Sequence, residues 1–260
     1  VVSAMFVGIG LELPAAVLLA AAIAAWVVMG YSIPWLAVLS NPRRPILEAA
    51  NGTWFIWLVA SQSIAVVAAG IEPLYPEARQ WLAIIAVTTW SMGVMLYAMC
   101  GLLLLFRLIM YRLEPQQLDP PYWITMGAMA ITVVAGARIV EMDDAPMIDV
   151  TRALIAGLSV IFWAFATWLI PALLAAGVWR HVVKRVPFRY QPTLWSFVFP
   201  MGMYAAASIY LGRANRLPVV EAVGEIWFWA ALLAWSITAV GMVFDIGGRL
   251  SAWRNTKETV

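Results

Sequence analysis

The chain has 260 residues, of which 64% are hydrophobic and 12% charged, and its formal net charge is +2. This composition excludes an average soluble domain, in which about a quarter of the residues are charged. A net charge so close to zero gives no indication of nucleic-acid binding, so the positions of the charges along the chain are more informative.

Seven long stretches of the chain contain no charged residue. Each is about as long as the roughly 20 apolar residues that an α-helix needs to cross a hydrocarbon core. A helix in a soluble core buries one face and carries charges on the other, so a soluble fold cannot hide seven such segments. The sequence therefore predicts an all-α integral membrane protein with spans at 13–42, 49–71, 80–106, 120–137, 153–179, 190–212 and 226–244.

The apolar stub at residues 1–11 precedes these spans. As a helix it would rise about 16 Å, roughly half of a bilayer core. It lacks the basic region and small-residue cleavage site of a signal peptide. We interpret it as the end of a transmembrane helix that begins upstream, so that the chain is truncated at its N-terminus; a short re-entrant or interfacial segment is the alternative. Residues 1–248 then form one membrane domain, and 249–260 a tail.

Basic residues gather in every second gap between the spans. Eleven Lys and Arg lie in these gaps and the tail, whereas the alternate gaps hold five and most of the carboxylates. By the positive-inside rule, the basic gaps and the C-terminus face the cytoplasm, and the 141–149 loop faces outside. The expected location is the cell membrane, plasma or bacterial inner. The eleven residues are Arg43, Arg44, Arg107, Arg112, Arg180, Lys184, Arg185, Arg189, Arg249, Arg254 and Lys257.

Cysteine and histidine are too scarce for common cofactor chemistry. Cys100 is the one cysteine and lies inside a span, which excludes an intrachain disulfide and a thiolate cluster. His181 is the one histidine and lies in a basic loop, where it faces solvent or lipid headgroups. The carboxylates lie at the ends of spans, so we expect no enzyme activity, no metal and no cofactor.

Three consecutive units of the sequence begin with a helix-start signal followed by Trp54, Trp123 and Trp195, which lie 69 and 72 positions apart. Each unit is one helical hairpin with a first helix rich in small residues and a bulkier second helix. Small residues let helices approach closely and can line a narrow path. The pattern predicts an inner ring formed by the stub at 1–11 and the first helices of the three units, with the other spans in an outer ring. The alternative is that the small residues make tight helix contacts with no path between them.

Two prolines interrupt spans and are expected to kink them. Pro171 frees the carbonyl of Thr167, and Pro200 frees that of Ser196. Phe199 directly precedes Pro200 on a helix of otherwise small residues. A bulky aromatic side chain at such a bend can close a pore by filling it. The alternative is that Phe199 packs against a neighbouring helix.

Four stretches of the chain, taken in order, resemble the tellurite-resistance/dicarboxylate transporter (TDT) family, which includes plant guard-cell slow anion channels and fungal malate and sulfite transporters. The stretches are 51–66, 120–130, 163–181 and 195–204. The resemblance implies ten helices in five tandem hairpins, with odd helices around a central pore and even helices outside. It also implies a homotrimer with one pore per subunit. The stub at 1–11 would then match the end of the third helix, and the seven full spans would match helices four to ten.

The resemblance also implies a role for one phenylalanine. The best-studied members close their pore with a Phe on the ninth helix, and Phe199 occupies the corresponding position. Phe197 is the rival, because two positions along a helix turn a side chain to a different face. Candidate pore-lining residues, chosen for small size or polarity on the inner helices, are Ser61, Gln62, Gly127, Ala130, Ser196 and Gly202.

The expected function is transmembrane transport of small anions, channel-like or facilitative, because no Lys or Arg inside a span could hold a dicarboxylate tightly. Basic residues at the cytoplasmic mouth would attract anions. They include Arg107, Lys184, Arg185 and Arg189. The alternative is a proton-coupled C4-dicarboxylate (malate) or sulfite exporter, which would need a carboxylate within the membrane. The nearest carboxylates, all at the borders of spans, are Glu12, Glu225 and Asp245.

Overall fold

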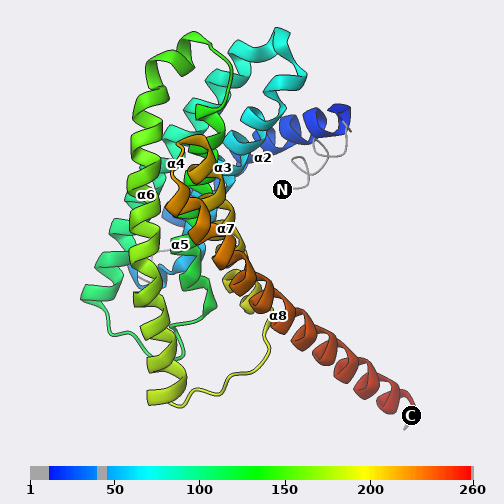
Figure 1. Cartoon of the computed structure of the whole chain (residues 1–260). Helices are drawn as coiled ribbons and strands as arrows, with labels where there is room; N and C mark the ends of the chain where they lie inside the picture. The colour runs from blue at the N-terminus through cyan, green and yellow to red at the C-terminus, as the bar shows by residue number, and fades with distance from the viewer. Residues whose placement is uncertain (1–11, 40–45, 259–260) are drawn as a thin grey trace.

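A computed structural model describes residues 12–39 and 46–258 of the chain, and these residues form helices and no β-strand (Figure 1). Seven helices in the described ranges are long and apolar enough to cross a membrane, which confirms the predicted class. The stub at 1–11 lies outside the described residues. The α-helices are α2 (Glu12–Leu39), α3 (Ile56–Ile71), α4 (Arg79–Met110), α5 (Ile124–Val140), α6 (Pro146–Val178), α7 (Trp195–Ala214) and α8 (Pro218–Glu258).

Short helical turns lead into the helices α3, α5 and α7. Each of these helices follows directly on a 3-10 turn, and two of the turns begin with proline, whose missing N–H is not needed at a helix start. Asn51 caps the first of them, since its side-chain oxygen accepts a hydrogen bond from the backbone N–H of Thr53 at 2.9 Å. The three repeated Trp motifs are thus helix starts, as predicted. The turns are η2 (Gly52–Phe55), η5 (Pro120–Trp123) and η7 (Pro192–Leu194).

Four further short segments complete the helical structure. Three are 3-10 turns in the connections, and the fourth is a π-helical turn that prolongs α6. They are η1 (Ile46–Ala49), η3 (Glu72–Leu74), η4 (Pro76–Ala78) and η6 (Trp179–Val183).

The helices form an inner and an outer layer. The most apolar window of α5 is 83% buried, whereas the corresponding windows of α4 and α6 are 22% buried and that of α8 is 11% buried. The chain pairs α3 with α4, α5 with α6 and α7 with α8, and α5 packs between α3 and α7 (Figure 1). The predicted inner position is confirmed for α3, α5 and α7, because each is more buried than its hairpin partner. The first member of the predicted inner ring, at 1–11, lies outside the described residues.

Tryptophans of the outer helices join each hairpin to the next inner helix. Trp26 of α2 donates a hydrogen bond from its indole N–H to the Ser61 hydroxyl of α3 at 2.8 Å. Trp90 of α4 donates in the same way to the Thr132 carbonyl of α5 at 3.0 Å. Trp163 of α6 donates to the Ser208 hydroxyl of α7 at 2.8 Å. These bonds satisfy polar groups that would be costly to bury unpaired in a membrane.

The connections between the helices gather at two opposite ends of the bundle. At one end, Arg180 donates from Nη1 to the carbonyl of Leu118 at 2.7 Å, which joins two of the basic gaps. At the other end, Arg79 donates from Nη2 to a carboxylate oxygen of Asp143 at 2.6 Å, which joins two of the acidic gaps. The alternation of charge in the sequence therefore corresponds to two chemically different ends.

Both prolines that the sequence singled out lie inside continuous helices, Pro171 in α6 and Pro200 in α7. The helix α8 continues to Glu258, so the described part of the predicted tail prolongs the last helix.

Candidate functional site

The candidate residues on α3 lie in contacts with neighbouring helices. Ser61 and Gln62 are both fully buried. Ser61 accepts the hydrogen bond from Trp26, and the Gln62 side-chain amide donates to the carbonyl of Trp90 at 3.1 Å. The side-chain oxygen of Gln62 has no hydrogen-bond partner among the described residues. This free group is an acceptor, which suits a water molecule or another donor and does not itself hold an anion.

The candidate residues on α5 set the spacing between two inner helices. Ala130 is fully buried, and Gly127 lies against the ring of Pro200 in α7. A Cβ at position 127 would lie 2.7 Å from Pro200 Cγ, closer than real side chains approach. Gly127 and Ala130 would affect a path by setting the distance between α5 and α7. That they line a pore stays a prediction.

The candidate residues on α7 are more open. Ser196 is half-buried and Gly202 is exposed. Gly202 lines a groove of about 470 Å³ between α7 and α8 that contains Ala206 and reaches Arg213. Small residues on α7 leave this groove open, and the guanidinium of Arg213 lies at the end of the groove. The lining role of Ser196 and Gly202 also stays a prediction.

The two candidate gate residues face different surroundings. The ring of Phe197 packs edge-on against Trp123 with 4.6 Å between centroids, and it lines a cavity at the basic end of the bundle. Phe199 is half-buried and lies on another face of α7. Phe197 thus has a packing partner in the turn η5 that leads into α5, and the gate role of Phe199 stays a prediction.

One of the basic residues expected at the mouth holds the loops together. Arg107 is only 4% exposed, and it donates to the carbonyl of Glu48 at 2.8 Å, to that of Tyr111 at 3.3 Å and to the side chain of Gln117 at 3.0 Å. Its donors are therefore engaged by the protein. Arg189 lines the cavity at the same end and is available to a ligand.

The sequence did not single out Glu72, which is the most deeply buried carboxylate at the acidic end. Glu72 is 1% exposed and pairs with Arg79, whose Nε lies 2.5 Å from a carboxylate oxygen. Arg79 also pairs with the exposed Asp143 of another loop at 2.6 Å. A carboxylate directly after an uncharged span, followed seven residues later by an arginine, was the signal that could have indicated this pair.

The carboxylates that the sequence did single out are less enclosed. Glu225 is exposed on α8, and Asp245 pairs with Arg249 at 2.9 Å. The side chain of Glu12 lies outside the described residues.

Two inner helices end in an arginine at the acidic end. The guanidinium carbon of Arg138, in the last turn of α5, lies 4.4 Å from the ring centroid of Tyr210, and its Nη2 donates to the Tyr210 hydroxyl at 2.9 Å. Arg213, in the last turn of α7, pairs with Glu221 at 2.8 Å. A cation at a helix C-terminus is favourable, and here it also places positive charge beside the inner layer.

The described residues contain no group of three His, Cys, Asp or Glu side chains that could hold a metal ion. Uncharged inner helices with cations at their ends, enclosed by an apolar outer layer, define a multi-pass membrane protein of the helical-bundle type. The profile of the voltage-dependent anion channel family (SLAC1) matches residues 1–243, and the chain belongs to this family. This match confirms the resemblance found in the four sequence stretches.

Relatives of known sequence carry names that agree with this class. The chain is 56% identical over 155 residues to an uncharacterized membrane protein of Mycobacterium tuberculosis, a match that covers 60% of this chain and 79% of the relative. It is 26% identical over 195 residues to an uncharacterized transporter of Methanocaldococcus jannaschii, a match that covers 75% of this chain and 55% of that protein. The chain thus spans about half the length of the archaeal relative. No solved structure matches the chain.

Proposed function

We propose that this protein transports small anions across a membrane along a path bounded by the inner helices α3, α5 and α7, in a channel-like or facilitative manner. The observation that carries the proposal is membership of the voltage-dependent anion channel family, established over residues 1–243. The names of the relatives give no substrate, so the substrate class is our inference from the family and from the charges of the bundle.

The distribution of charge supports weak passage over tight binding. The spans that form α3, α5 and the first part of α7 carry no charged side chain, and Arg138 and Arg213 stand where α5 and α7 end. Both arginines pair with carboxylates, Arg138 with Glu141 and Arg213 with Glu221, so neither is left to hold an anion tightly. This arrangement favours conduction of several small anions.

We assign the gate of this path to Phe199. It directly precedes Pro200, whose ring is held against Gly127, so the α7 backbone is fixed at this point. A side chain on a fixed backbone can block or clear a narrow path by changing its rotamer. The packing of Phe197 against Trp123 argues for Phe199 over Phe197.

The proposal extends to assembly and orientation. We propose a homotrimer with one path per subunit in the cell membrane, plasma or bacterial inner, with the C-terminus in the cytoplasm. Large apolar side chains are exposed along α4 and α8, as expected where a helix meets lipid or another subunit. Trp81, Met95 and Trp229 are examples, each more than 65% exposed.

One observation favours the second candidate, a proton-coupled C4-dicarboxylate (malate) or sulfite exporter. Glu72 is a buried carboxylate at the end of an inner helix, and its ion pair with Arg79 compensates its charge. Carboxylates of this kind serve as proton carriers in coupled transporters.

The test is flux of malate, sulfite, nitrate and chloride through the full-length protein in liposomes, at fixed membrane potential, with and without a pH gradient. We expect flux of several anions that is independent of the pH gradient, and higher flux in Phe199→Ala. Phe244→Ala, which alters an exposed side chain on α8, is the matched control and should leave flux unchanged.

Other outcomes would redirect the assignment. Flux that needs the pH gradient and is lost in Glu72→Gln would establish the coupled exporter and contradict the channel. Absence of flux for all four anions would refute anion transport. The mass of the purified complex in detergent, measured by light scattering, tests the trimer separately.

A further inference from the structure

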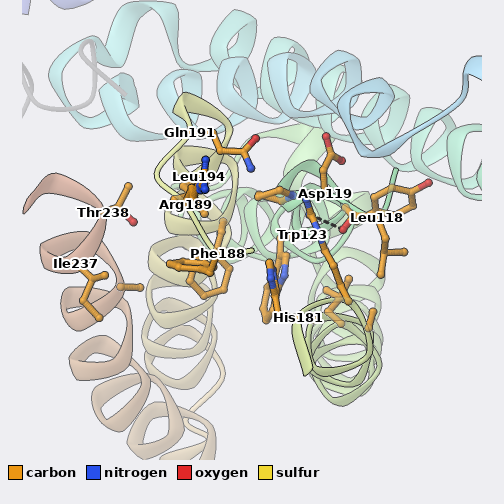
Figure 2. A pocket seen from close by; sticks show the side chains of 18 of the residues that line it. Leu118, Asp119, Trp123, His181, Phe188, Arg189, Gln191, Leu194, Ile237 and Thr238 are labelled. Atoms are coloured by element: carbon orange, nitrogen blue, oxygen red, sulfur yellow. Dashed lines mark hydrogen bonds between the residues drawn. The ribbon is translucent and has the colours of Figure 1, made fainter. Parts of the chain in front are cut away.

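A cavity of about 260 Å³ lies at the basic end of the bundle, between α6 and α8 (Figure 2). The side chains of Trp123, from the turn η5, and of Phe197, from the start of α7, lie at its inner side. The helices α6 and α8 scarcely touch each other, so the cavity opens between two outer helices. Its walls are formed by Leu173, Ala176 and Gly177 of α6 and by Ala234, Ile237 and Thr238 of α8.

A buried cation with a free donor lines this cavity. Arg180 is 7% exposed, and its Nη1 donates to the carbonyl of Leu118 at 2.7 Å. Its Nε is buried and has no hydrogen-bond partner in the described part of the chain. Leaving a charged group buried without full hydrogen bonding is costly, and the positive charge of the Arg180 guanidinium beside the cavity favours an anion there.

Two further basic side chains face the same cavity. His181 belongs with Arg180 to the π-helical turn η6, a kind of turn that often occurs at functional sites. The Nδ1 of His181 lies 2.8 Å from the carbonyl of Val186 and donates to it, which leaves Nε2 for another partner. Arg189 contributes a second guanidinium from the loop that precedes α7.

The one carboxylate of the cavity does not cancel this charge. Asp119 lines the cavity opposite two arginines and a histidine. Burial raises the pKa of the Asp119 carboxyl above its ordinary value, and the positive charge of Arg180 opposes this rise. The balance of charge in the cavity is therefore positive.

We propose that this cavity binds the phosphate headgroup of an anionic phospholipid from the leaflet at the basic end. The phosphate would accept from Arg180, and the acyl chains would lie outside along α6 and α8. Basic pockets between transmembrane helices are known to suit anionic headgroups. The proposal does not depend on the anion path, since the cavity lies between the outer helices.

The chemistry of the walls favours a lipid over a free anion. Most of the lining is apolar, and Ile237 in the wall is 56% exposed. Exposed apolar side chains continue beyond the cavity, with Leu174 52% exposed and Leu233 62% exposed. An acyl chain would cover this surface and gain from doing so, whereas inorganic phosphate would bury none of it.

The experiment measures the thermal unfolding of the full chain in detergent by tryptophan fluorescence. Dioleoylphosphatidylglycerol is titrated in, with dioleoylphosphatidylcholine and inorganic phosphate at the same concentrations as the other arms. We expect a saturable rise in the unfolding midpoint with the phosphatidylglycerol and no comparable rise in the other arms. An equal rise with phosphatidylcholine, or with inorganic phosphate, would overturn the proposal.

Variants locate the site. Arg180→Gln should weaken the apparent affinity for phosphatidylglycerol about tenfold or more, as expected for loss of a hydrogen bond to a charged group. Gly177→Leu adds a side chain at the cavity wall and keeps Arg180, so it decides the question if Arg180→Gln does not fold. Arg249→Gln removes an exposed cation at the same end, outside the cavity, and should respond as the wild type does. The site would be refuted if phosphatidylglycerol raised the unfolding midpoint of Gly177→Leu as it does that of the wild type, and if Arg180→Gln, where it folds, also responded like the wild type.

Discussion

Gly127 of α5 packs directly against Pro200 of α7, and a Cβ at position 127 would lie 2.7 Å from Pro200 Cγ and 3.0 Å from Pro200 Cα. The two helices are therefore as close as their backbones allow. The contact holds the proline of α7 and with it the adjacent Phe199. A glycine at this position is required by the proximity of the neighbouring helix.

Gly127→Ala is expected to destabilise the protein, because the added methyl group must push α5 and α7 apart. Overpacking of this kind costs about 1–3 kcal/mol. The measurement is the thermal unfolding midpoint in detergent. Gly157→Ala is the matched control, since nothing in the described part of the chain lies within 4 Å of a Cβ there. It should be neutral or stabilising by about 0.5–1 kcal/mol, and an equal loss in both variants would contradict the packing argument.

Trp90→Phe is expected to lower stability, because it leaves the carbonyl of Thr132 without its hydrogen bond from the buried indole. The loss should be about 1–3 kcal/mol. Trp81→Phe alters an exposed tryptophan of the same helix, 70% exposed, and should change stability by less than about 0.5 kcal/mol. Unfolding followed by circular dichroism measures both. If Trp90→Phe were as stable as the control variant Trp81→Phe, the hydrogen bond from Trp90 to Thr132 would contribute little to stability.

Phe197→Ala and Phe199→Ala are expected to act on different properties. Phe197→Ala removes the edge-on contact with Trp123 and should lower stability by about 1–3 kcal/mol with little change in flux per folded protein. Phe199→Ala should raise flux with a smaller loss of stability. Liposome flux and unfolding midpoints measured on the same preparations separate the two effects. Higher flux in Phe197→Ala alone would transfer the gate role to Phe197.

Arg79→Gln is expected to destabilise the acidic end more than Asp143→Asn does. Removal of the arginine leaves the buried carboxylate of Glu72 without its partner, whereas Asp143 is exposed and its pair with Arg79 is solvated. Unfolding midpoints of the two variants at neutral pH give the comparison. The double variant Arg79→Gln with Glu72→Gln should recover part of the loss, and no recovery would argue against an uncompensated charge as the cause.

Asp119→Asn is expected to stabilise the protein at neutral pH. Burial raises the folded-state pKa of Asp119 above its ordinary value of 3.8, so folding favours the protonated carboxyl. The stability from this protonation is present below the unfolded pKa and is lost as pH rises through the folded pKa. The midpoint of the wild type should therefore fall relative to Asp119→Asn as pH rises from 4 to 8. If the difference in midpoint between the wild type and Asp119→Asn stayed constant from pH 4 to 8, the charge of Asp119 would not be the cause of that difference.

Much of the membrane fold could be predicted from the sequence because its signals are local. The length of the uncharged stretches predicts the spans, and the motifs at Trp54, Trp123 and Trp195 indicate where inner helices begin. The small residues that follow these motifs indicate close packing of the helices. The buried pair of Glu72 with Arg79 and the stacking of Arg138 on Tyr210 are harder to predict, because the two partners of each contact belong to different helical elements.

The sequence by itself determined the class of this protein, its spans, its two chemically different ends and its resemblance to an anion transport family, since hydropathy and charge act residue by residue in a bilayer. Only the tertiary structure decided which groups meet. It set Gly127 against Pro200, turned Phe197 toward Trp123 and buried Arg180 beside the cavity between α6 and α8. Such contacts depend on the rotation and spacing of whole helices, which close packing settles over the entire bundle at once.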